Sequence, residues 1–146
     1  MVKQTLAKPK LRFKNYIDSW QLKKLSELLE FKNGINAQKE QYGHGVKFIN
    51  VLDILNNDFL TYDKIIGSVD IDDTTLNRNS VSYGDILFQR SSETREEVGS
   101  ACVYLDKDRI SAFGGFVIRG KKIGTYDPVF FNKLLKTDLA RDEITS

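Results

Sequence analysis

Side chains that can form hydrogen bonds with a nucleic acid gather in two polar stretches of the sequence, residues 32–47 and 89–95, with two further lysines nearer the C-terminus. Asn and Gln amides can pair with adenine, whereas Arg, Lys and hydroxyl groups suit guanine or phosphate. These residue types are also ordinary in surface turns, so solvated loops without a ligand are the alternative. The base-reading candidates are Asn33, Asn36, Lys39, Gln41 and His44, and the candidates for phosphate or groove contacts are Arg90, Ser91, Ser92, Arg95, Lys121 and Lys122.

Groups that could carry out covalent or acid–base catalysis are scarce. The chain has one histidine, His44, and one cysteine, Cys102. A Cys–His pair would suit nucleophilic catalysis, but Cys102 lies in an apolar run, where cysteine normally packs as a small hydrophobic residue. His44 stands between two glycines in a polar stretch, which favours a surface turn or a contact with a partner. The sequence therefore predicts no catalytic residue.

One acidic cluster deserves a test as a metal site. Asp70, Asp72 and Asp73 lie close together in the sequence, and carboxylates are the ligands that hard divalent cations prefer. A metal-dependent nuclease is one alternative, and a solvated turn is the interpretation we favour.

The glycines of Gly43–Gly45 and Gly114-Gly115 lack the spacing and the Lys-Ser/Thr ending of a phosphate loop. We expect neither a metal nor a nucleotide bound by this chain.

Length and composition indicate one folded domain. The chain has 146 residues, of which 40% are hydrophobic and 29% charged, values typical of a globular protein large enough for one core. A single cysteine excludes an internal disulfide and fits a reducing compartment. No stretch approaches the roughly 18 to 20 apolar residues that a membrane span needs, and the N-terminal region contains no signal-peptide core. We expect a cytoplasmic location and no membrane partner.

Positive charge is concentrated near the N-terminus. Residues 1–24 contain seven Lys or Arg residues and one acidic residue, although the whole chain has a net charge of only +2. A basic N-terminal segment suits phosphate binding, but short lysine-rich ends also serve as solubilising tails. Both interpretations stay open.

Neighbouring helices and strands must position the two polar stretches. Apolar residues at three- and four-residue steps predict an amphipathic helix from Asp18 to about Asn33. Residues 34–45 then predict a long exposed loop. Short strands are expected at residues 46–51, 59–71, 86–88, 101–105 and 113–118, with a helical turn at 52–57. Asp127-Pro128 predicts the start of a C-terminal helix, whose apolar face contains Phe131, Leu134, Leu135 and Leu139.

This order of elements has no regular βαβ alternation and predicts an α+β fold: an N-terminal amphipathic helix, a mixed and mostly antiparallel sheet, and a C-terminal helix. The last three expected strands should lie side by side in one sheet. The apolar face of the C-terminal helix suits either the core or a protein interface, and we favour the core.

A series of short segments along the sequence forms a recognisable pattern by its order and spacing. The segments are Pro9-Lys10-Leu11-Arg12-Phe13, Trp20, Lys24-Leu25, Tyr83-Gly84-Asp85-Ile86-Leu87-Phe88-Gln89-Arg90-Ser91-Ser92, Glu97-Val98-Gly99, Phe113-Gly114-Gly115-Phe116-Val117-Ile118-Arg119, Asp127-Pro128-Val129-Phe130, Leu134-Leu135 and Leu139-Ala140-Arg141. Together they resemble specificity subunits of type I restriction-modification enzymes. The resemblance covers nearly the whole chain and implies a single target recognition domain over residues 1–146, with a basic N-terminal segment at 1–14.

In that family, a full subunit carries two target recognition domains, and each reads one half of a split DNA sequence. Long helices between the domains hold the methyltransferase subunits. The resemblance therefore implies sequence-specific recognition of double-stranded DNA, with a methyltransferase (M) subunit and a restriction (R) subunit as partners. Catalysis with S-adenosylmethionine, ATP and magnesium belongs to those partners, so the resemblance implies no cofactor in this chain.

The sequence departs from the family pattern at its end. The chain stops at Ser146, where the family continues into a spacer helix. A truncated gene product, an excised domain and a half-subunit are the three explanations that we consider. The main alternative function is a fragment that binds methyltransferase or specificity subunits rather than DNA, and the other is the small metal-dependent nuclease.

Overall fold

Two β-sheets form the framework of the computed structural model, which describes residues 24–92, 94 and 97–145. The larger sheet has five strands in the order β1-β8-β5-β6-β3, and the smaller has three in the order β4-β2-β7. Most pairs are antiparallel, whereas β3–β6 and β2–β7 are parallel. The strands are β1 (Leu29–Asn33), β2 (Tyr42–Ile49), β3 (Phe59–Leu60), β4 (Gly67–Val69), β5 (Ile86–Gln89), β6 (Ala101–Tyr104), β7 (Ala112–Phe113) and β8 (Val117–Lys122).

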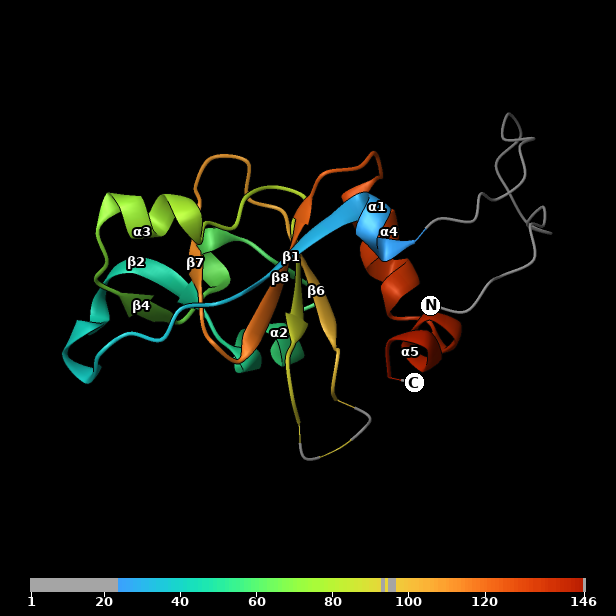
Figure 1. Cartoon of the computed structure of the whole chain (residues 1–146), viewed down its shortest axis with the longest axis horizontal. Helices are drawn as coiled ribbons and strands as arrows, with labels where there is room; N and C mark the ends of the chain where they lie inside the picture. The colour runs from blue at the N-terminus through green and yellow to red at the C-terminus, as the bar shows by residue number, and fades with distance from the viewer. Residues whose placement is uncertain (1–23, 93, 95–96, 146) are drawn as a thin grey trace.

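Short helices cover both ends of this framework (Figure 1). α3 lies over the smaller sheet, while α1, α4 and α5 gather at the far end of the larger one. No helix in the described ranges is long and apolar enough to cross a membrane. The α-helices are α1 (Leu25–Leu28), α2 (Val51–Asn56), α3 (Asp73–Arg78), α4 (Pro128–Leu135) and α5 (Asp138–Thr145), and the 3₁₀ turns are η1 (Lys39–Gln41) and η2 (Tyr62–Lys64).

The central strands β5 and β6 of the larger sheet are buried on both faces. Successive residues of a strand point to opposite faces, so Leu87 and Cys102 pack into one cluster with Phe113, while Ile86 and Val103 pack into another. The first cluster also contains side chains from α2 and the smaller sheet, and the second contains Phe131 and Leu135 of α4. The sheet is therefore a rigid platform from which the connecting turns project.

The α+β class expected from the sequence is confirmed. The expected strands at 86–88 and 101–105 are β5 and β6, which are neighbours in the larger sheet. The stretch 113–118 is not one strand, because the chain turns at Gly114-Gly115. Its first residue belongs to β7 in the smaller sheet and its end to β8 in the larger sheet. The expectation that all three strands share one sheet was therefore wrong for β7.

The N-terminal amphipathic helix was predicted too long. Within the described part of the predicted helix, residues 24–33, only Leu25–Leu28 is helical, and residues 29–33 form β1, which pairs with β8 over its whole length. Leu29 and Phe31 also fit a period of two, with Leu29 buried. The hydrogen bonds available along β8 favour the extended conformation over a helical continuation. The predicted start at residues 18–23 lies outside the described residues.

The predicted loop at 34–45 and strand at 59–71 also differ from the structure. β2 already begins at Tyr42, and its pairing with β4 shifts register between Tyr42 and Val46. Gly43 and Gly45 have φ values of 98° and 95° there, a conformation that glycine adopts without steric cost. Residues 59–71 form two short strands, β3 and β4, on either side of η2. The expected helical turn at 52–57 is α2.

The start of the C-terminal helix is confirmed. The Asp127 carboxylate accepts a hydrogen bond from the Phe130 backbone N–H at 2.9 Å, and Pro128 occupies the first turn of α4. The helix ends at Leu135, and a second helix, α5, begins at Asp138. Phe131 and Leu135 are buried against the larger sheet and Leu134 packs partly against the same cluster, so this part of the predicted apolar face forms core. Leu139 belongs to α5, and its side chain lies outside the described residues.

We expect Asp127→Ala to lower the free energy of unfolding by about 1 kcal/mol, because an N-cap carboxylate satisfies a backbone N–H that otherwise has no partner in the helix. Urea titration monitored by circular dichroism measures this change. Asp108→Ala is the matched control, since Asp108 is an exposed carboxylate outside any helix. Equal losses for the two variants would contradict a capping role.

Candidate nucleic-acid interface

The turn between β7 and β8 brings the two polar stretches together. The Asn36 amide oxygen lies so close to Gly115 that a Cβ atom added to the glycine would be 2.2 Å from it. Arg90, which directly follows β5, donates from Nη1 to the Gly115 carbonyl oxygen at 3.2 Å. The Arg90 backbone N–H donates to the Phe116 carbonyl oxygen at 2.9 Å. We call Asn36, Arg90, Gly115 and Phe116 the Gly115 cluster.

Backbone pairing from both sheets fixes this cluster. The Gly34 N–H donates to the Val117 carbonyl oxygen at 3.3 Å, which holds the chain after β1 against the start of β8. Only glycine fits at position 34, because an added Cβ would lie 2.0 Å from the Gly114 carbonyl oxygen. Gln89 pairs with Val117, which carries Arg90 to the same turn. Two segments far apart in sequence are thus positioned by the sheets rather than by loop flexibility.

The exposed groups of the cluster have complementary chemistry. Both Asn36 and Arg90 are exposed to solvent. Among the described residues, none forms a hydrogen bond with the Asn36 amide, which leaves its donors and acceptor available. The Arg90 guanidinium has five N–H donors, and the Gly115 carbonyl engages Nη1 alone. An amide beside a fixed cation can contact a base edge and a phosphate at the same time.

The other predicted base-reading residues lie on β1, η1 and β2, on either side of Asn36 in the sequence, and their surroundings differ. Asn33 is exposed at the end of β1, and Lys39 is exposed in η1. The Gln41 amide is engaged by the fold, since it accepts from the Gln38 N–H at 2.8 Å and donates to the Asp70 carbonyl oxygen at 2.9 Å. His44 Nε2 lies 3.4 Å from Asp70 Oδ2 in an exposed pair.

The predicted phosphate contacts fall into two separate places. Ser91 is exposed beside Arg90, and the Ser92 hydroxyl donates to Glu97 Oε2 at 3.0 Å. Arg95 lies outside the described residues. Lys121 and Lys122 are at the end of β8 that is remote from the Gly115 cluster.

Internal acceptors bind both of these lysines. Lys121 Nζ is 3.7 Å from Oδ2 of the buried Asp85, and Lys122 Nζ donates to the Gly124 carbonyl oxygen at 3.0 Å. The structure therefore groups Arg90 and Ser91 with Asn36, and places Lys121 and Lys122 elsewhere.

The acidic residues 70, 72 and 73 have separate roles. Asp72 is the N-cap of α3, and its Oδ1 accepts from the Thr75 N–H at 2.7 Å. Hydrogen bonds from the Thr75 side chain and from its backbone N–H hold the pKa of Asp72 below its ordinary value. Asp70 faces His44. Over the part of the chain that the structure describes, no group of three or more His, Cys, Asp or Glu residues could hold a metal ion. Within these described residues, Asp70, Asp72 and Asp73 do not form the metal site that the nuclease alternative requires.

Cys102 is a core residue. Its side chain is fully buried in β6, and its Sγ donates to the Asn57 carbonyl oxygen at 3.4 Å. Desolvation by burial raises the pKa of the Cys102 thiol to about 12, so the thiolate that a nucleophile requires is not populated at neutral pH. His44 is exposed in the other sheet, and the two residues do not form a catalytic pair.

We expect the folded protein to resist modification at Cys102. At pH 8, Ellman's reagent should react slowly with the native chain and stoichiometrically in urea, because only unfolding exposes the thiol and lets it ionise. Absorbance at both conditions measures the reactive fraction. Fast modification of the native protein would contradict the buried position.

Sequence reasoning missed the apolar members of this surface. Phe116 is 72% exposed at the tip of the turn, and Tyr42 is 40% exposed across from it. Together with Asn36 they line a groove of about 590 Å³ between the turn, β2, β4 and the start of α2. Figure 1 shows the β7–β8 turn at the same edge of the molecule as α2. The glycine pair before Phe116 was the available sequence signal for an exposed turn.

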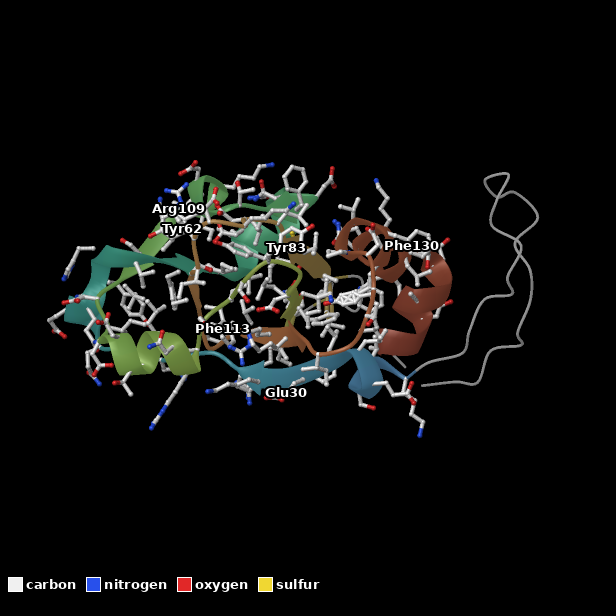
Figure 2. All side chains as sticks on the ribbon, turned by 90° about the horizontal axis from the view of Figure 1, so that it is seen from above. Glu30, Tyr62, Tyr83, Arg109, Phe113 and Phe130 are labelled. Atoms are coloured by element: carbon white, nitrogen blue, oxygen red, sulfur yellow. The ribbon has the colours of Figure 1, made fainter. Side chains whose placement is uncertain are left out.

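A second surface combines aromatic rings with cations. Arg109 lies over the Tyr62 ring at 4.4 Å, and Figure 2 shows these two residues together on the side away from Glu30. The Arg109 guanidinium is also 2.9 Å from Asp63 Oδ1, and that hydrogen bond raises its pKa further. Asp106 lies beside it and accepts backbone hydrogen bonds that lower its pKa. These carboxylates make the surface a weaker phosphate site than the Gly115 cluster.

Comparison with known proteins gives matches among solved structures. No family model and no curated protein matches the sequence. The HsdS subunit from Thermoanaerobacter tengcongensis superposes with a TM-score of 0.56 at 15% identity, over 83% of this chain and 27% of that chain. A chain from a structure of complex assembly and conformational transition in the type I R-M system gives a TM-score of 0.54 at 14% identity, over 84% of this chain and 31% of that chain.

The fold described above is therefore that of chains from type I restriction-modification systems, and the resemblance seen in the sequence is confirmed at the level of the fold. One of these structural neighbours is the HsdS specificity subunit itself. The present chain spans about three tenths of the length of these neighbours.

Proposed function

We propose that this chain is a target recognition domain that reads a specific sequence in duplex DNA as part of a type I specificity subunit. The observation that carries the proposal is the convergence of Asn36 and Arg90 at Gly115. The likeness in fold to a specificity subunit supports it. In this proposal the domain has no catalytic activity and acts in the cytoplasm.

In this proposal, Asn36 and Arg90 of the Gly115 cluster contact different parts of the DNA. The Asn36 amide can pair with the edge of a base in the major groove, and a good amide–adenine pair contributes about 1–3 kcal/mol of discrimination. Arg90 can neutralise a phosphate and so fix the register of the domain on the duplex. Methyl transfer and cleavage, with S-adenosylmethionine, ATP and magnesium, belong to the M and R subunits that the domain would direct.

Selection from a randomised duplex library tests this proposal. The chain should enrich one sequence, and Asn36→Ala should reduce discrimination at one base pair with little change in the affinity for unrelated DNA. Fluorescence anisotropy with the selected duplex and with single-base variants measures both quantities. Asn77→Ala is the matched control, because Asn77 is an exposed asparagine on α3.

Two results would count against DNA reading. One is the absence of any enriched sequence at low salt. The other is an enriched sequence whose discrimination is identical in the wild type, Asn36→Ala and Asn77→Ala. Stable association with a methyltransferase subunit but not with DNA would favour the interaction-fragment alternative.

A further inference from the structure

We propose that the groove beside the Gly115 cluster holds one base of the bound DNA after that base has left the stack. This inference rests on the proposed function and extends it, because reading base edges in a groove of intact duplex needs no cavity. The occupant is defined by chemistry as a single nucleobase that remains joined to its phosphates.

The lining of the groove matches a neutral, planar and polar-edged ligand. Its fifteen lining residues include no charged side chain. The volume of about 590 Å³ lies within the ~300–1,000 Å³ typical of small-ligand pockets. Tyr42 and Phe116 supply aromatic rings, and Asn36 and Asn50 supply amides. Rings for stacking and a few amides for hydrogen bonds are what an extruded base requires.

Glycines keep the amides of the groove in place. An added Cβ at Gly67 would be 2.8 Å from Asn50 Nδ2, and one at Gly115 would be 2.2 Å from Asn36 Oδ1. Both amides thus lie directly on glycine backbone, where any side chain would displace them. Gly43 and Gly114 also line the groove. At these four glycines the lining has no side chain, which leaves room for a planar ring.

The charge distribution around the groove distinguishes a nucleotide from an apolar peptide. Arg90 is bonded to Gly115 at the border of the groove, outside the uncharged lining. A neutral cavity with a cation at its edge is complementary to a neutral base with a phosphate at its edge. Phe116 at 72% and Ile66 at 82% exposure flank the opening. Exposed apolar side chains of this kind can fill the space that a departing base leaves in a duplex.

Fluorescence of 2-aminopurine placed in turn at each position of the selected duplex tests the inference. Stacking quenches this base, so binding of the wild-type chain should raise its fluorescence at one position. A mismatch at that position should increase affinity by roughly tenfold, because a mismatched base needs less free energy to leave the duplex than a paired one. Phe116→Ala should abolish the rise, and Phe130→Ala, an exposed phenylalanine on α4, should leave it intact.

Sequence-specific binding without a fluorescence rise at any position would contradict the proposal that the groove holds a base, and it would leave the proposed reading of DNA intact. A rise that persists unchanged in Phe116→Ala would also overturn the proposal of a base in the groove. Gly67→Ala offers a second variant on a different element, and it should reduce the rise by displacing the Asn50 amide.

An NMR titration tests the inference if the chain does not bind duplex DNA. Side-chain amide NMR signals of Asn36 and Asn50 should then shift on titration with single-stranded tetranucleotides, which would identify a base site that takes single strands. Absence of such shifts would overturn the inference. Loss of both signals on addition of the methyltransferase subunit, with no response to oligonucleotides, would instead identify the groove as a protein interface.

Discussion

Arg90→Ala should weaken binding to the selected duplex by roughly tenfold and reduce the slope of log affinity against log salt by about one. The expected loss follows from the position of the guanidinium, which the Gly115 carbonyl holds at 3.2 Å. A pre-positioned arginine loses little conformational freedom on binding, so its phosphate contact is stronger than that of a free side chain. Fluorescence anisotropy over a salt series measures affinity and slope together.

Arg78→Ala provides the matched control for this experiment. Arg78 is an exposed arginine at the end of α3. Figure 1 shows α3 on the opposite side of the smaller sheet from the β7–β8 turn. Its loss removes the same net charge from the protein. If both variants lowered the affinity and slope equally, Arg90 would act only through overall charge, and the Gly115 cluster would lose its assigned role.

Asp85→Ala should lower the free energy of unfolding by about 3 kcal/mol, the largest effect on stability that we expect from removing one polar side chain. Asp85 is buried, with Oδ2 accepting from the Ser82 N–H and Oδ1 from the Lys122 N–H, both at 2.9 Å. Removing the carboxylate leaves two backbone donors without an acceptor, and each costs about 1–3 kcal/mol when buried. Lys121, 3.7 Å away, also loses its counter-charge.

Chemical denaturation of three variants separates this effect from a simple loss of charge. Asp85→Asn keeps one side-chain oxygen, so its loss should be smaller than that of Asp85→Ala. Asp63→Ala removes a carboxylate that is 80% exposed and paired with Arg109. Exposed pairs contribute at most about 1 kcal/mol. If Asp63→Ala lowered the free energy of unfolding as much as Asp85→Ala, the hydrogen bonds from Asp85 to the backbone of β8 would not explain the effect.

Local signals in the sequence were sufficient where one residue type has one dominant conformation. Asp127-Pro128 predicted the start of α4, because the carboxylate cap and the fixed φ of proline act within a single turn. The apolar runs at β5 and β6 were also found, since strands buried on both faces read as continuous hydrophobic segments. By contrast, Leu25, Leu28 and Leu29 fit a helical period while Leu29 and Phe31 fit a strand. Pairing with β8, some ninety residues later in the sequence, decides between them.

The candidate site was predictable by residue type and not by arrangement. The sequence by itself determined that polar side chains suited to DNA lie in two stretches and that the chain has one histidine and one cysteine. Only the tertiary structure decided that Asn36 and Arg90 meet at Gly115 while Lys121 and Lys122 lie apart. It also decided that Phe116, an apolar residue, stays exposed. The physical reason is that burial and contact between distant segments depend on how strands pair across the whole chain, and no local period encodes that pairing.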